Sequence, residues 1–109
     1  MSGPNSPRGT TNRNQRGDTS VRRARRQWLL DTFGDGIEAP CSIGWDENCL
    51  GMVRDDGTLT VDRYPIPGID GGTYDYDNIR PACGPCNSRA GTALREARRR
   101  ERQDARVRA

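Results

Sequence analysis

Apolar residues recur at helical spacing in the stretch that follows residue 18. The five positions are Val21, Ala24, Trp28, Leu29 and Phe33. This spacing is typical of a helix with one buried face. Trp28 could stack on a base, but a tryptophan at this spacing more often belongs to the core. Thr19 or Ser20 can cap the start, and Gly34 or Gly36 can end the helix. The pattern therefore predicts an amphipathic helix over residues 19–35.

Two short apolar runs and a loop follow. Met52–Arg54 and Thr58–Val61 flank an Asp-Asp-Gly turn, which predicts two strands joined by a tight turn. Tyr64–Asp77 carries two prolines and three glycines and is expected to be a loop, with an extended piece at Asn78–Ala82 after it.

The two ends of the chain are basic. Residues 1–17 are rich in Gly, Pro, Ser, Asn and Arg, as disordered arms are. Residues 88–107 contain no proline and predict a second basic helix, frayed beyond Arg100. We therefore divide the chain into an arm (1–18), a helix (19–35), a central domain (36–100) and a basic tail (101–109).

The composition favours a single domain with a small core. The chain has 109 residues, of which 31% are hydrophobic, against about 45–50% in an ordinary globular domain. A metal or covalent crosslinks should help to hold such a fold. The sequence shows neither a membrane-length apolar run nor a signal peptide, so we expect a cytoplasmic protein without a membrane partner.

Charge is distributed unevenly. Residues 1–26 carry seven arginines and one acid, residues 27–82 three arginines and eleven acids, and residues 83–109 eight arginines and three acids. Solvation of the flanks would explain this pattern without any function, but arginine blocks commonly contact nucleic acid. The candidate phosphate contacts are Arg22, Arg23, Arg25, Arg26, Arg80, Arg89, Arg95 and Arg98.

All 18 basic residues are arginine, and histidine is absent. The absence of histidine and lysine excludes Ser-His-Asp and Cys-His nucleophiles, histidine-based metal sites and the P-loop lysine. Any general base must therefore be something other than imidazole.

The four cysteines predict a structural zinc site. Cys83 and Cys86 form a CxxC pair, and Cys41 and Cys49 supply the other two thiolates. A Cys₄ site leaves no open position for substrate and can contribute about 10 kcal/mol to folding. Two disulfides are the main alternative, and a redox CxxC site is less compatible with the two further cysteines.

Zinc bound in this way would bring Asp62, at a strand end, close to Asn87, in the first turn of the last helix. A carboxylate and an amide oxygen suit Mg²⁺ or Mn²⁺. Taken singly, Asp62 could be a turn residue and Asn87 a helix cap.

The segments Val61–Gly68, Gly71–Thr73 and Asp77–Gly91 resemble the HNH endonucleases, particularly the small Cys₄-zinc members carried by actinobacterial phages and prophages. The resemblance covers residues 41–91. It implies an α+β, zinc-stabilised ββα-metal (His-Me finger) fold with flanking basic helices.

The resemblance also implies roles for four residues. Asp62 looks like the first ligand of the catalytic ion, and Asn87 stands where the last His or Asn binds that ion, as in the endonuclease VII-like CxxCN branch. Asn78 matches the middle Asn, which fixes the loop and orients the base. Arg63 stands where the family usually has its catalytic His, although an Asp-Arg pair recurs among the small phage members.

Arginine stays protonated and cannot accept a proton, although it can stabilise developing charge. The base would then be a hydroxide on the ion or a nearby carboxylate. Asp70, Asp75 and Asp77 are the nearby carboxylates, and Tyr64 is a weaker candidate.

The resemblance implies a metal-dependent DNA endonuclease or nickase that hydrolyses phosphodiester bonds with structural Zn²⁺ and catalytic Mg²⁺ or Mn²⁺. If the chain is phage-encoded, it would act in the bacterial host cytoplasm, on DNA, with terminase or other packaging proteins as partners. The alternative is a non-catalytic zinc module that binds DNA and has lost its base.

Overall fold

Residues 16–108 are described by a computed structural model, and the arm expected over residues 1–18 lies largely outside them. The first described helix, α2, spans Thr19–Phe33 and ends at Gly34, as predicted. Its cap is Asp18 and not Thr19 or Ser20, because the Asp18 carboxylate accepts hydrogen bonds from the Val21 N–H and the Ser20 hydroxyl.

The buried face of α2 differs from the predicted stripe. Leu29 and Leu30 are buried together with Arg25, whereas Val21 and Phe33 are exposed. The face that meets the strands is centred on Leu29 and Leu30, which turns the start of the predicted stripe towards solvent. Trp28 belongs to the packing as expected, since its ring stacks on Tyr76 with centroids 4.5 Å apart.

The strands form two small antiparallel sheets. β1 (Glu38–Pro40) pairs with β2 (Met52–Arg54), and β3 (Leu59–Arg63) pairs with β4 (Ile79–Cys83). The predicted hairpin is therefore wrong in its pairing: β2 and β3 are joined by the turn but belong to different sheets. At the turn the Arg54 N–H donates to the Thr58 hydroxyl at 2.9 Å.

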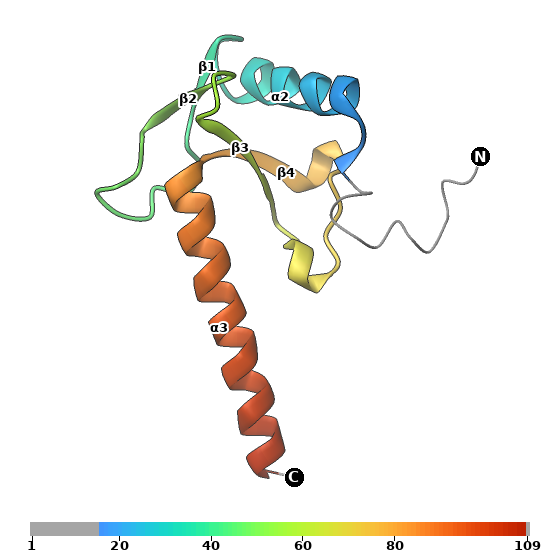
Figure 1. Ribbon diagram of the computed structural model, residues 1–109, viewed down its shortest axis with the longest axis vertical. Coiled ribbons are helices and arrows are strands. Elements are labelled where there is room, and N and C mark those ends of the chain that lie inside the picture. The colour runs from blue at the N-terminus through green and yellow to red at the C-terminus, as the bar shows by residue number, and fades with distance from the viewer. Residues whose placement is uncertain (1–15, 109) are drawn as a thin grey trace, which may run out of the picture.

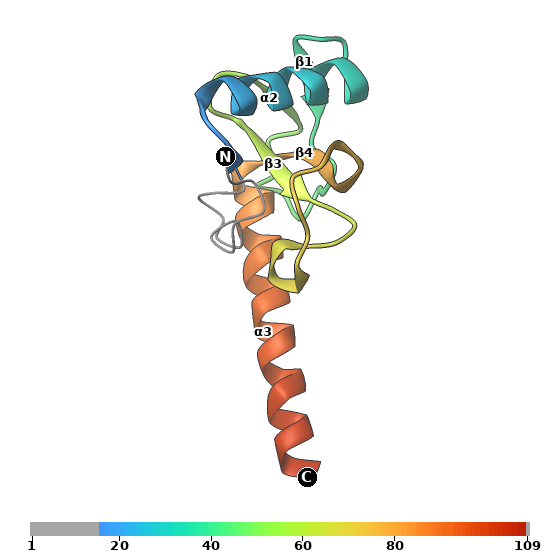
Figure 2. The same cartoon turned by 90° about the vertical axis from the view of Figure 1, so that its right-hand side faces the viewer.

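The loop between β3 and β4 contains two short 3₁₀ helices, η2 (Gly68–Asp70) and η3 (Tyr76–Asn78). The last helix, α3, spans Gly84–Arg108, so it starts earlier than predicted and continues past Arg100 without the expected fraying. α2 lies across the strands at one end of the molecule, and α3 extends away from them (Figures 1 and 2).

A small core joins these elements. Leu29 and Leu30 from α2 pack with Val53, Leu59 and Ile79 from the strands. Cys83 and Cys86 are buried in the same core, at the junction of β4 and α3. The ββα unit β3–β4–α3 is thus anchored at its base by cysteines. Within residues 16–108 the structure has no helix that combines the length and apolar character of a membrane span.

Candidate functional site

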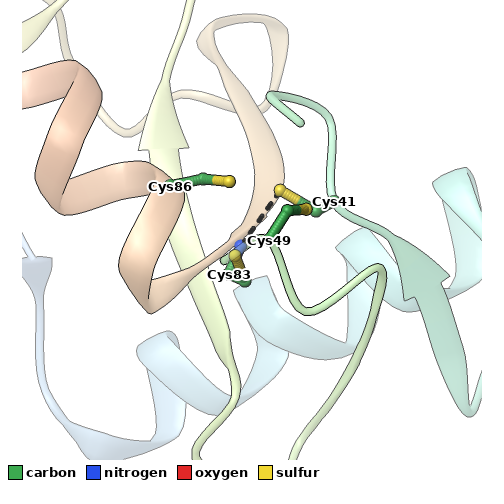
Figure 3. Close-up of side chains that lie close together, drawn as sticks. All are labelled: Cys41, Cys49, Cys83 and Cys86. Atoms are coloured by element: carbon green, nitrogen blue, oxygen red, sulfur yellow. Dashed lines mark hydrogen bonds between the residues drawn. The ribbon is translucent and has the colours of Figure 1, made fainter. Parts of the chain in front are cut away.

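Four cysteines converge where β4 meets α3. Cys83 ends β4, Cys86 lies in the first turn of α3, and Cys41 and Cys49 come from the segment that links β1 to β2 (Figure 3). Their four Sγ atoms lie within 4.8 Å of one another, and all four are free thiols. The predicted cluster is therefore formed, and the disulfide alternative is not.

Each sulfur accepts a backbone N–H. The pairs are Trp45 N to Cys86, Leu50 N to Cys83, Gly51 N to Cys49, and Cys83 N to Cys41, at 3.2 to 3.5 Å. Amide donors aimed at sulfur stabilise thiolates and orient metal ligands.

The pKa values of Cys41 and Cys86 also favour a bound cation. Burial opposes ionisation of Cys41, but backbone N–H groups, including that of Cys83, lower its pKa to about 6. Cys86 accepts the Trp45 N–H, which lowers its pKa, yet burial and the three neighbouring sulfurs raise it to about 12. Four thiolates cannot coexist here without a cation. The donor set fits a bound metal ion with four sulfur ligands.

A groove of about 670 Å³ runs along β3 and the first half of α3. Asp62 and Asn87 both line it. Asp62 lies opposite Arg80 in the β3–β4 pairing, and Arg80 Nε contacts Asp62 Oδ2 at 2.7 Å. This ion pair was not predicted, because the pairing register depends on how the long loop closes.

Asn87 is oriented by β3. Its Nδ2 donates to the Thr60 hydroxyl at 3.0 Å and to the Val61 carbonyl at 3.3 Å. Because the nitrogen is used in this way, Oδ1 is the atom left to act as a ligand. Thr60 was missed at the sequence level, although strand alternation places it on the same face of β3 as Asp62.

Asn78 is buried and holds the loop together. Its Oδ1 accepts from Ile66 N at 2.9 Å, and its Nδ2 donates to the Ile66 and Thr73 carbonyls at 2.8 and 2.9 Å. Gly72 lies against this amide, and a Cβ there would collide with the Ile66 carbonyl oxygen. Asn78 is thus placed to fix the loop and not to contact a reacting group.

Arg63 lies at the base of the same loop. Its Nη1 donates to the Gly72 carbonyl at 3.3 Å, and its guanidinium lies 4.5 Å from the centroid of the Tyr74 ring. A side chain at Gly68 would collide with the guanidinium. Arg63 therefore packs against the loop while also lining the groove.

Three of the base candidates lie outside the groove lining. Asp70, Asp75 and Asp77 do not line it, whereas Tyr64 does. Asp70 forms an ion pair with Arg98, whose hydrogen bond lowers the pKa of that carboxyl and weakens it as a proton acceptor.

The eight candidate phosphate contacts separate into groups. Arg22 and Arg23 are exposed on α2, and Arg95 lines the groove. Four others form ion pairs with acids: Arg26 with Asp55, Arg80 with Asp62, Arg89 with Asp46, and Arg98 with Asp70. The assignment of Arg25 as a freely exposed contact needs correction, because its side chain is buried with its guanidinium over the Tyr74 ring.

Comparison with known proteins identifies one family. The family model described as HNH endonuclease matches residues 47–93. The match includes three of the four cysteines and the whole ββα unit up to Ala93, whereas Cys41 and α2 lie before it. No curated protein and no solved structure matches the chain.

Proposed function

We propose that this chain belongs to the HNH endonuclease family, whose model matches residues 47–93, and that it is a metal-dependent DNA endonuclease that hydrolyses phosphodiester bonds to nick DNA. The observation that carries the proposal is the joint placement of Asp62 and Asn87 in one groove, on a ββα unit anchored by four cysteines. Nucleases of this family act on DNA, which is consistent with the arginines on α2 and α3.

We assign zinc to the cysteines, since four thiolates in a closed site suit it. We assign Mg²⁺ or Mn²⁺ to Asp62 and Asn87 in the open groove, because such ions accept two protein oxygens and keep several waters. The Arg80 contact uses Asp62 Oδ2, so Oδ1 is the oxygen for the cation. A divalent cation bound there would polarise the phosphodiester and stabilise the leaving oxygen.

The other residues position the DNA strand. Arg95 and the exposed arginines of α2 bind phosphates, and Asn78 keeps the loop in place beside the groove. Arg63 donates hydrogen bonds and stabilises negative charge, and the proton of the attacking water goes to another acceptor.

The test is nicking of supercoiled plasmid by the full chain with Mg²⁺ or Mn²⁺. Asp62→Asn and Asn87→Ala should each lose roughly 100-fold or more of the activity. Asp104→Asn and Asn48→Ala are matched controls, since both residues are exposed and neither lines the groove. Substitutions in the groove test the proposed catalytic ion more specifically than a strong chelator does, because a chelator would also remove the metal from the cysteine site.

Nicking that survives both groove variants would come from a contaminant and would remove the assignment. DNA binding without nicking in any metal would instead favour the non-catalytic zinc module, an outcome consistent with the absence of histidine. We also propose a phage role in genome processing with terminase, which rests on the resemblance to small phage members. Co-purification of the tagged chain with terminase from infected cells tests it.

A further inference from the structure

A second hollow, of about 300 Å³, lies between α2 and β3. The α2 residues Arg22, Arg25 and Arg26 line it on one side, and Thr60 and Asn87 line it on the other. It shares Arg16, Val61, Tyr74 and Asn87 with the larger groove, so the two hollows adjoin at the proposed cation ligand.

Arg25 is the unusual residue of this hollow. Its side chain is only 6% exposed, and its buried Nε has no hydrogen-bond partner among residues 16–108. One face of the guanidinium is covered by the Tyr74 ring, 4.8 Å from the centroid. Leaving a buried N–H of a charged group unpaired is costly, and a bound ligand is one group that can satisfy it.

The charges around the hollow select an anion. None of the residues that line it is acidic. Arg26 is already paired with Asp55 outside this lining set, but Arg22 is exposed at its edge. Burial also lowers the pKa of the Arg25 guanidinium, and a bound anion would offset that effect.

We propose that this hollow binds one phosphodiester group of the DNA strand, on the α2 side of the scissile phosphate that would be bound near Asp62 and Asn87. Arg25 would donate from the buried side and Arg22 from the rim. The site would fix the position of the strand relative to the groove without reading its bases. The inference rests on the proposed function for its choice of ligand, but not on turnover.

The first test follows the Arg25 Nε–H resonance by ¹⁵N NMR in the full zinc-loaded chain. A 12-base-pair DNA duplex is titrated without added Mg²⁺ or Mn²⁺, and inorganic phosphate is titrated separately. Arg25→Lys assigns the resonance. The duplex should shift it to saturation. A resonance that the duplex leaves unmoved, including one that responds to inorganic phosphate alone, would overturn the proposal.

The second test compares two neighbouring exposed arginines, whose replacement should leave the fold intact. Arg22→Gln should weaken duplex binding by about tenfold and reduce the salt slope by about 1, as expected for one lost phosphate contact. Arg23 is also exposed but does not line the hollow, so Arg23→Gln should weaken duplex binding severalfold less than Arg22→Gln does. Equal effects of the two variants would contradict a built site.

The two proposals fail separately. Nicking with an unmoved Arg25 resonance would keep the nuclease and remove this phosphate site. A saturating shift without nicking would keep the phosphate site and remove the nuclease.

Discussion

Asp62 and Arg80 face each other across β3 and β4, and Arg80 Nε contacts Asp62 Oδ2 at 2.7 Å. The Arg80 guanidinium also lies 3.8 Å from the centroid of the Tyr64 ring. The Asp62 carboxylate, which we propose as a ligand of the catalytic ion, is therefore held on one side by the Arg80 guanidinium, and the Tyr64 ring packs against that guanidinium. Arg80 acts on the proposed ion through Asp62.

The first prediction is an energetic coupling between these two residues. Because the pair is half-buried, Arg80→Met and Asp62→Asn should show a coupling free energy of about 1 kcal/mol in urea unfolding. The exposed pair of Arg54 with Glu38 is the comparison, and its cycle should give less. A coupling no larger than that of the exposed pair would mean that Arg80 does not orient Asp62.

The second prediction concerns the loop held by Asn78. Asn78→Ala removes three hydrogen bonds in a buried site and should lower the free energy of unfolding by about 2–3 kcal/mol. Gly72→Ala should also destabilise, because its Cβ would displace the Ile66 carbonyl. The control Asn48→Ala, at an exposed position, should stay within about 0.5 kcal/mol of the wild type. Equal stability of the Asn78 and Asn48 variants would show that the loop does not depend on this amide.

The sequence pattern predicted the positions of the helices and strands better than it predicted which strands pair. The CxxC spacing and the scarcity of apolar residues were enough to predict the cysteine cluster, because four cysteines in so small a chain have few other uses. The pairing of β3 with β4 could not be read from the turn after Arg54, since the two strands meet only after the loop from Tyr64 to Asn78 has closed. The Asp62–Arg80 pair depends on that register.

The same limit applies to α2. Helical spacing identified the helix, but a pattern with apolar residues on more than one face does not determine which face is buried. Tertiary contacts bury the face that carries Leu29 and Leu30, and in this orientation of α2 Arg25 is also buried, against Tyr74. A buried arginine has no signature in sequence, which is why Arg25 was grouped with the exposed arginines beside it.

The third prediction concerns metal and pH. The folded pKa of Cys41, about 6, lies below its ordinary value of 9.0, so the folded state favours its thiolate. The stability from this group is complete above pH 9 and is lost as the pH falls through 6. Protons also compete with the metal for all four sulfurs. We therefore expect one metal per chain at pH 8, release at or below about pH 6, and a lower Tm after release.

A metal-sensitive dye can follow this release during acid titration, with circular dichroism as the readout of folding. Cys86→Ser should shift release to higher pH, since it removes one ligand. Ser42→Ala is the control, as Ser42 is exposed beside Cys41. A Tm that does not respond to metal removal would contradict a structural role for the cluster.

The last prediction addresses Arg63, which the resemblance to the HNH endonucleases aligns with the position of their catalytic histidine. Arg63→His replaces a group that cannot accept a proton with one whose ordinary pKa is about 6.5. If the wild type lacks an imidazole base, its nicking rate should keep rising with pH up to about 9, whereas the variant should reach a plateau above about pH 7. The variant also loses the contacts of Arg63 with Gly72 and Tyr74, so its free energy of unfolding should fall by about 1 kcal/mol.

Arg63→Gln separates the two effects, because it loses the same loop contacts without gaining a base. We expect Arg63→His to nick faster than Arg63→Gln at pH 7 and the two variants to have similar stability. The pH profile of nicking at fixed Mn²⁺, normalised to the folded fraction, measures this difference. Identical profiles for the two variants would show that a proton acceptor at position 63 does not limit the rate, and that the loop contacts are what Arg63 contributes.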